Sequence, residues 1–180
     1  NKLLVGTATP CMKVAKKLAL KGISGMEFFI GIPGTIGGAI KMNAGAYDGQ
    51  TSDFLRTLKA VDRKGKIHSI VVNKEDMTYR KSNFPDDWIF VSAEFEGTIL
   101  NQEKVTEKIK KFSNDREKTQ PIRQATGGST FKNTKNKKAW RLIKDAGCYG
   151  MSVGSARLSD IYLNFIINNG SATSADIELL

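Results

Sequence analysis

Apolar positions of this 180-residue chain recur with two different periods, which predict both helices and strands. One stripe at helical spacing consists of Val14, Ala15, Leu18 and Ala19. Thr9-Pro10 precede the stripe and Gly22 follows it. A hydroxyl residue and a proline are typical of a helix start, and glycine of a helix end. We therefore expect the first helix between these punctuation residues, with Thr9 as its cap.

The rest of the chain alternates between strand-like and helical stretches. Residues 102–117 form a basic helix with Val105, Ile109 and Phe112 on its buried side, and its lysines are expected to be solvated. A further helix is predicted over 139–146, ended by Gly147, and a last one starts at Thr173. Strand-like runs cover 3–5, 55–62, 66–72, 88–95 and 164–168. Lys64-Gly65 favours a hairpin between the second and third of these runs, whereas residues 126–129 (TGGS) are expected to form a loop.

This alternation, without any repeat period, predicts an α+β or α/β class. Residues 113–126 are mainly polar, which is typical of a boundary between domains. We therefore expect two domains, 1–112 and 113–180. Both ends look cut. The chain opens at Asn1 without a methionine and enters a strand at once, and it stops at Leu180 shortly after a helix start. We expect it to be a piece of a longer chain.

Charge and composition narrow the classes of partner. Lys and Arg number 28 against 18 Asp and Glu, so the net charge is +10, which implies nucleic acid, a nucleotide or a phosphorylated substrate. No apolar run approaches the roughly 18 residues of a membrane span, and no signal segment opens the chain. We therefore expect a cytoplasmic protein with no membrane partner. Cys11 and Cys148 lie far apart and His68 is the only histidine, so a Cys/His zinc site is excluded.

Residues 150–154 (GMSVG) match the nucleophile elbow of esterases, with Ser152 at its centre. That chemistry needs a histidine base after the serine in the chain, and His68 precedes it. A serine hydrolase is therefore disfavoured. His68 is read as a polar residue on a hairpin strand and receives no role.

Two further segments have both a functional and a plain interpretation. Residues 31–39 (GIPGTIGGA) could aim successive backbone amides at one anion, because glycine permits positive φ and close approach. Composition alone slightly favours a pair of tight turns between core elements. Residues 128–133 (GSTFKN) combine hydroxyl, cationic and amide groups, so they could hold a phosphorylated sugar or form a turn.

The order of these segments resolves the ambiguity through a resemblance. The motifs follow one another as GIPGTIGGA at 31–39, NAGAY at 43–47, YRKS at 79–82, GSTFKN at 128–133, AWRLIKDAG at 139–147 and NFIIN at 164–168. Together they resemble the UDP-N-acetylenolpyruvoylglucosamine reductase (UDP-N-acetylmuramate dehydrogenase) family of bacterial peptidoglycan synthesis, over essentially the whole chain. The short interval between Ser82 and Gly128 is similar to the family's shorter type.

The resemblance implies an α+β flavoenzyme. Residues 1–112 would be a vanillyl-alcohol-oxidase-like FAD-binding domain without its amino-terminal lobe, and 113–180 a smaller α/β substrate-binding domain without its end. NADPH would reduce FAD, and a hydride would then pass to the enolpyruvyl group of UDP-N-acetylglucosamine-enolpyruvate. The product, UDP-N-acetylmuramate, serves cell-wall biogenesis and hence cell shape and division. A cytoplasmic monomer without nucleic acid is expected.

The same resemblance implies roles for single residues. Arg80 would stabilise negative charge on the substrate carboxylate, and Ser129 would donate the proton. The remaining positions divide into flavin contacts at Gly34, Gly37, Gly38 and Asn43, and substrate contacts at Tyr79, Lys132 and Asn133. The family's second acidic catalytic residue would lie beyond Leu180, and its Gly-Ser-Asn flavin loop upstream of Asn1. We therefore expect this stretch alone to bind FAD weakly or not at all. No metal site is expected.

Two rival classes stay open at this stage. Another FAD oxidoreductase of the same superfamily would lack the paired YRKS and GSTFKN segments. A basic nucleic-acid-binding module would interleave aromatic residues with Lys and Arg on one face. Lys104, Lys108 and Lys111 share a helix without such a rhythm.

Overall fold

The computed structural model describes residues 1–180, which divide into two compact units, Asn1–Ser113 and Asn114–Leu180. The division lies one residue from the expected boundary. Each unit has its own four-stranded antiparallel sheet and is described by itself. The architecture has the expected mixture of helix and strand, but the strands of the smaller unit are antiparallel rather than the parallel strands of an α/β domain. The assignment of the units to cofactor and substrate binding stays a prediction.

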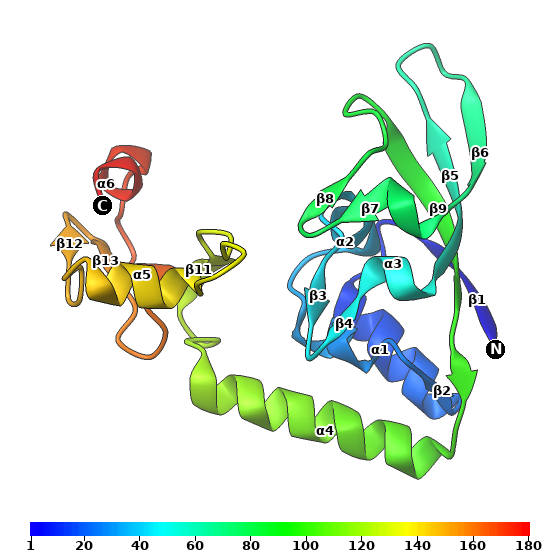
Figure 1. Ribbon diagram of the computed structural model, residues 1–180, viewed down its shortest axis with the longest axis horizontal. Helices are drawn as coiled ribbons and strands as arrows, with labels where there is room; N and C mark the ends of the chain where they lie inside the picture. The colour runs from blue at the N-terminus through cyan, green and yellow to red at the C-terminus, as the bar shows by residue number, and fades with distance from the viewer. The chain divides into compact units, whose positions relative to one another are not determined.

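The sheet of the first unit follows the predicted strands. Its order is β1 (Lys2–Gly6), β9 (Ile89–Glu96), β5 (Leu55–Val61) and β6 (Ile67–Val71). The β5–β6 hairpin, whose turn projects from the unit in Figure 1, confirms the turn expected at Lys64-Gly65. Gly65 adopts φ 79° there, a conformation that costs glycine little.

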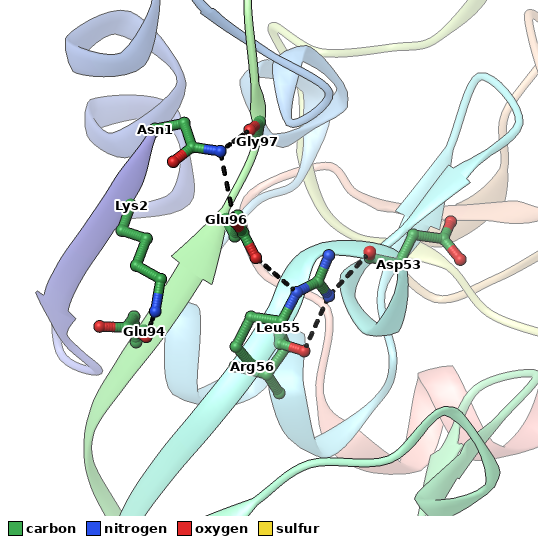
Figure 2. A network of polar contacts seen from close by, with 8 residues as sticks. All are labelled: Asn1, Lys2, Asp53, Leu55, Arg56, Glu94, Glu96 and Gly97. Carbon is green, nitrogen blue, oxygen red and sulfur yellow. Dashed lines mark hydrogen bonds and ion pairs between the residues drawn. The ribbon is translucent and has the colours of Figure 1, made fainter.

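A network of polar side chains joins three of these strands at the surface (Figure 2). Arg56 on β5 pairs with Glu96 on β9 at 3.1 Å, and it also donates to the carbonyls of Asp53 and Leu55. Lys2 on β1 pairs with Glu94 at 3.0 Å. Exposed pairs of this kind contribute at most about 1 kcal/mol each, so the network orders the strand edges more than it stabilises the fold.

The first helix, α1 (Cys11–Leu20), buries the predicted stripe against the short 3₁₀ helix η1 (Glu27–Gly31). Gly22 ends it with φ 62°, as expected. The expected Thr9 cap is wrong, because Pro10 occupies the cap position without a side-chain hydrogen bond. The Thr9 carbonyl instead accepts the Ile36 amide at 3.0 Å. Thr9 is therefore bonded to the glycine segment, whereas the Pro10 carbonyl accepts the amides of Lys13 and Val14 in the first turn of α1.

The glycine segment is not simply a pair of turns. Gly34 has φ 100°, and a short helix follows, α2 (Ile36–Lys41), which includes Gly37 and Gly38. Glycine is a poor helix former, so the burial of Ile36, Ala39 and Ile40 is what favours this helix. After α2 the chain forms the strand pair β3 (Gly45–Ala46) and β4 (Gly49–Gln50), and then α3 (Thr51–Phe54).

The remaining elements of the first unit are short, apart from a long helix that begins in this unit and continues past its last residue, Ser113. They are β2 (Ile23–Ser24) paired with β10 (Thr98–Ile99), η2 (Lys74–Asp76), and β7 (Met77–Thr78) paired with β8 (Lys81–Ser82). Helix α4 (Gln102–Thr119) buries Val105 and Ile109, and its Phe112 ring stacks on Tyr47 at 3.9 Å between centroids. Lys108 is not simply solvated, because its ammonium lies 3.5 Å from the buried carboxylate of Glu27.

The second unit is built around a sheet of order β11 (Ala125–Ser129), β14 (Phe165–Asn168), β13 (Ala156–Leu158) and β12 (Ser152–Val153). The expectation of a loop at 126–129 is wrong, because these residues form the edge strand β11. An edge position tolerates glycine, and the ladder shifts register between Thr126 and Ser129, where Gly128 has φ 91°. The match to the esterase elbow lies on the β12–β13 hairpin, which agrees with its rejection.

Two helices accompany this sheet, α5 (Ala139–Asp145) and α6 (Ser174–Leu179). Thr173 caps α6 through a reciprocal bond pair with Asp176. The apolar stripe predicted for α5 is buried only at Ala139, and Leu142 is 38% exposed. Cys11 is buried, as expected of a small apolar residue, whereas Cys148 is half-buried. None of the helices combines the length and apolarity that crossing a bilayer would require.

Candidate functional site

Arg80 occupies a strained position at a tight turn. It is the second residue of the two-residue connection between β7 and β8, and its φ is 56°. A side chain with a Cβ in this left-handed region costs roughly 1–2 kcal/mol. The guanidinium donates to the carbonyls of Asn43 at 3.3 Å and Gly45 at 2.8 Å. The Tyr79 ring lies 4.9 Å from its central carbon, a cation–π distance that helps to direct the fork.

Asn43 supports this turn from the interior. It is fully buried with φ 39°, and its amide nitrogen donates to the Thr78 carbonyl at 3.0 Å. Its amide oxygen accepts the Ser52 backbone N–H at 3.0 Å. On the other side of the turn, the Ser82 hydroxyl donates to the Lys41 carbonyl at 3.0 Å. The turn that carries Arg80 is therefore clamped on both sides onto residues 41–45. The structure gives Asn43 a supporting role, and its expected flavin contact stays a prediction.

The glycine segment borders a cavity of about 450 Å³ in the first unit. The amides of Ile36 and Gly37 do not point at an anion, because they donate to the carbonyls of Thr9 and Thr7. The glycines of this segment instead allow a ligand to approach the backbone closely. A Cβ built on Gly38 would meet nothing within 4 Å, whereas one on Gly37 would lie 3.4 Å from Thr7. The cavity lining consists of Thr7, Ala8, Thr35, Gly37, Gly38, Lys41, Asp86, Trp88 and Phe90.

The cavity thus combines backbone without side chains, two aromatic rings and one cation. Lys41 at its margin pairs with Asp86 at 2.6 Å, and this pairing lowers the pKa of the Asp86 carboxyl. Such a lining suits a planar, partly apolar group that needs close backbone approach. The residues present therefore fit a flavin at Gly37 and Gly38. Gly34 is not among the lining residues, and its predicted flavin contact is untested.

Ser129 lies in the second unit at the end of β11, opposite Phe165 of β14. It is exposed and borders a mainly apolar hollow of about 460 Å³, lined also by Gly127, Gly128 and Ile166. Arg80 belongs to the first unit and Ser129 to the second. That they share one site stays a prediction.

Lys132 and Asn133 follow in the next loop. Lys132 is exposed, in keeping with a contact to an anionic ligand. The side-chain oxygen of Asn133 accepts the Ala139 amide at 2.9 Å, so it caps the start of α5. This structural bond accounts for one of the groups that Asn133 was expected to offer a substrate. Its substrate contact also stays a prediction.

The residues given no role have structural partners. The His68 ring bonds to Asp62 at 2.9 Å and stacks on Trp88 at 4.2 Å between centroids. The hydrogen bond from His68 holds the pKa of the Asp62 carboxyl below its ordinary value. Burial raises the pKa of the Cys11 thiol to about 11, which makes it unreactive at neutral pH. Neither group belongs to the candidate site.

Comparison with known proteins finds two matching family models and several relatives. A family model described as an FAD binding domain matches residues 1–70, and one described as the UDP-N-acetylenolpyruvoylglucosamine reductase C-terminal domain matches residues 120–180. The UDP-N-acetylenolpyruvoylglucosamine reductase of Methylorubrum extorquens is 47% identical over 173 residues, which cover 96% of this chain and 56% of that protein. That of Anaplasma marginale is 42% identical over 178 residues, covering 99% of this chain and 60% of that protein.

A solved structure agrees in fold as well as in sequence. The crystal structure of the Thermus caldophilus UDP-N-acetylenolpyruvylglucosamine reductase matches with a TM-score of 0.89 and 31% identity, over 98% of this chain and 65% of that one. The chain is similar to UDP-N-acetylenolpyruvoylglucosamine reductases along nearly all of its own length. It spans little more than half the length of the curated reductases it matches. The resemblance and the expected FAD-binding fold are thereby confirmed.

Sequence reasoning missed the supporting roles of two residues whose hydrogen bonds hold the motif segments in place from elsewhere in the chain. Asn43 was chosen for the flavin, but its described bonds support the Arg80 turn. Asn164 lay in a quoted motif without a role, and its side chain bonds to both backbone groups of Phe131. The available signal was an asparagine directly before an apolar strand run (NFIIN), because buried amides need partners.

Proposed function

We propose that the protein is an FAD-dependent, NADPH-using oxidoreductase. It reduces the enolpyruvyl group of UDP-N-acetylglucosamine-enolpyruvate to the lactyl ether of UDP-N-acetylmuramate. Support comes from the names of relatives at 42–47% identity and from the FAD-binding match to residues 1–70. The proposal includes a place in peptidoglycan synthesis, and hence in cell shape and division, with NADPH and the UDP-sugar drawn from the cytoplasm.

The orientation of Arg80 is the observation that carries the proposal. Two backbone carbonyls and an aromatic ring hold one guanidinium at a backbone position that disfavours any residue but glycine. Strain of this kind persists only where the surroundings enforce it, and it concentrates at functional sites. A clamped, permanently charged fork is what a reaction with a developing carboxylate charge requires.

The cavity beside Gly37 and Gly38 is the candidate place for the flavin ring system. A side chain at Gly38 would project into this open space, so the absence of a Cβ leaves room for a planar group. When bound, FAD would supply a two-electron acceptor for the NADPH hydride and a hydride donor for the substrate. The part of this chain is to hold and orient the reacting groups.

Arg80 would act on charge. Hydride addition to the terminal vinyl carbon moves an electron pair toward the neighbouring carbon and its carboxylate, giving an enolate-like anion. A fixed guanidinium interacts more strongly with this anion than with the starting carboxylate, and that difference is what lowers the barrier. The bonds to the Asn43 and Gly45 carbonyls keep the guanidinium plane from turning away.

Ser129 would act on the proton. The enolate-like carbon must receive one proton to complete the lactyl ether, and the Ser129 hydroxyl is the proposed donor. A hydroxyl is a weak acid, so it must be held at the carbon and reprotonated afterwards. The Gly128 bulge and the pairing with Phe165 fix where this hydroxyl emerges from the edge strand.

The test is made on the intact protein. We expect bound flavin absorbance and NADPH oxidation that depends on added UDP-N-acetylglucosamine-enolpyruvate. Omission of the sugar nucleotide, or its replacement by UDP-N-acetylglucosamine, should leave only slow oxidation by oxygen. Equal NADPH oxidation with and without the enolpyruvyl group would refute the proposed substrate. Absence of any bound flavin would refute the proposal that the protein is an FAD-dependent oxidoreductase.

A further inference from the structure

Asn164 joins two segments of the second unit that lie 33 positions apart in the chain. Its side-chain oxygen accepts the Phe131 N–H at 2.9 Å, and its side-chain nitrogen donates to the Phe131 carbonyl at 2.8 Å. Its own carbonyl accepts the Thr130 N–H at 2.8 Å. The residue is only 3% exposed. One amide therefore satisfies both backbone groups of a single residue, as a neighbouring strand would.

These bonds continue the sheet beyond its last backbone pair. The β11–β14 ladder ends where Ser129 faces Phe165, and the side chain of Asn164 takes over at the next positions. Phe131 is 57% exposed, so burial of this residue does not hold the stretch. The polar bonds do. Each is worth about 1 kcal/mol when both partners are present and more when one is removed in the interior.

The stretch held in this way carries the expected substrate-facing groups. Ser129 precedes it directly, Lys132 follows it, and Asn133 is fixed in turn by its bond to the Ala139 amide. We propose that Asn164 is a positioning residue that sets the direction of the Ser129 hydroxyl and of Lys132 by fixing the backbone of residues 130–131. This inference rests on the proposed function for its catalytic consequence, but its structural half can be tested alone.

The principal variant is Asn164→Leu, which keeps the branched shape of the side chain and removes its two side-chain bonds to Phe131. Ser159→Ala is the matched control. Ser159 is 1% exposed in the same unit, and its hydroxyl oxygen accepts the amides of Ile161 and Tyr162 at 3.2 and 3.3 Å. Both variants thus lose two bonds to backbone at a buried site, but only the first touches the Ser129 segment. Asn164→Asp keeps the size and the acceptor for the Phe131 N–H but loses the donor to the Phe131 carbonyl, and it provides a second variant should the leucine variant fail to fold.

Two measurements are made on the intact flavin-loaded protein. Amide hydrogen exchange should accelerate at Phe131 by about tenfold or more in Asn164→Leu, and at Ile161 and Tyr162 in the control. In stopped flow, reoxidation of the reduced flavin by the enolpyruvyl UDP-sugar should slow by about 10–100-fold in Asn164→Leu. Reduction by NADPH should stay within about twofold of the wild type in both variants. Asn164→Asp should fall between the wild type and Asn164→Leu in the reoxidation rate.

The outcomes separate this inference from the proposed function. Unchanged Phe131 exchange in Asn164→Leu would overturn it, as would equal slowing of both half-reactions in that variant. Slowing of reoxidation by the control to the same extent would also overturn it, because general destabilisation would then suffice. A wild-type flavoprotein that is not reoxidised by the enolpyruvyl sugar would instead refute the proposed function. In that case faster Phe131 exchange would still establish that Asn164 fixes the segment.

Discussion

Arg80 shows how much of this site is set by one residue's surroundings. Its backbone is strained and its side chain has two carbonyl acceptors, so the geometry of the guanidinium fork is fixed before any ligand binds. A lysine offers one compact ammonium, which cannot bridge the same acceptors and match a carboxylate with two donors. The charge alone therefore does not carry the function that we propose.

Arg80→Lys should slow flavin reoxidation by the enolpyruvyl sugar by about 10²–10³-fold, the usual cost of losing one oriented donor to a developing anion. Stopped-flow absorbance at the flavin band measures this rate. Arg56→Lys is the control, because Arg56 also donates to two backbone carbonyls in the first unit. An equal loss in the control would show that destabilisation, not charge orientation, explains the effect.

Ser129 and Ser152 provide a similar contrast in the second unit. Both are exposed serines on strands, but only Ser129 ends the edge strand beside the Asn164-held segment. Ser129→Ala should leave flavin reduction by NADPH nearly intact and slow reoxidation by about 10²–10⁴-fold, because only the second half-reaction needs the proton. Ser152→Ala should change neither rate. Equal slowing of both half-reactions by Ser129→Ala would contradict a proton-donor role.

At the scale of elements, the β5–β6 hairpin has a polar centre that responds to acid. Asp62 accepts the amides of Lys64 and Lys66 through one oxygen and bonds to His68 through the other. The hydrogen bond from His68 is the main cause of the lowered pKa of Asp62. A carboxyl with a lowered folded-state pKa contributes stability above its unfolded pKa of about 3.9 and loses it as pH falls through the folded value.

Asp62→Asn tests this contribution, because asparagine keeps an acceptor for the turn amides but cannot ionise. The wild type should be the more stable protein at pH 6, and the gap should narrow as pH falls below about 4. Urea unfolding between pH 6 and 2.5 gives the free energy of unfolding of both proteins. A gap that stays constant or widens in acid would refute the assignment.

The elements also show what sequence reasoning can and cannot reach. Helix α1, helix α4 and the β5–β6 hairpin were predicted because their apolar periods and turn residues lie close together in the chain. Helix α2 and strand β11 were missed because tertiary burial and edge pairing override the glycines they contain. The family's motif residues were found by resemblance. The bonds that orient them, such as Asn43 to Thr78, join distant segments and leave no local pattern.

At the scale of the molecule, the net charge of +10 produces the interaction that acts over the longest distance. Lys104, Lys110 and Lys111 of α4 are exposed, whereas Lys108 is drawn toward the buried Glu27. A positive field of this kind raises the local concentration of any anionic ligand without specifying which one binds. It would also attract any polyanion, so retention on nucleic acid is not by itself a function.

The charge therefore predicts weak, nonspecific retention on duplex DNA. On a DNA column the 180-residue chain should bind at low ionic strength and elute below about 0.3 M salt, with no difference between sequences, because released counterions drive such binding. Added UDP-N-acetylglucosamine-enolpyruvate should not change this retention, because the retention arises from the charge of the surface as a whole. Retention that survives higher salt, or that discriminates one sequence by tenfold or more, would point to a built nucleic-acid site and against a purely electrostatic origin.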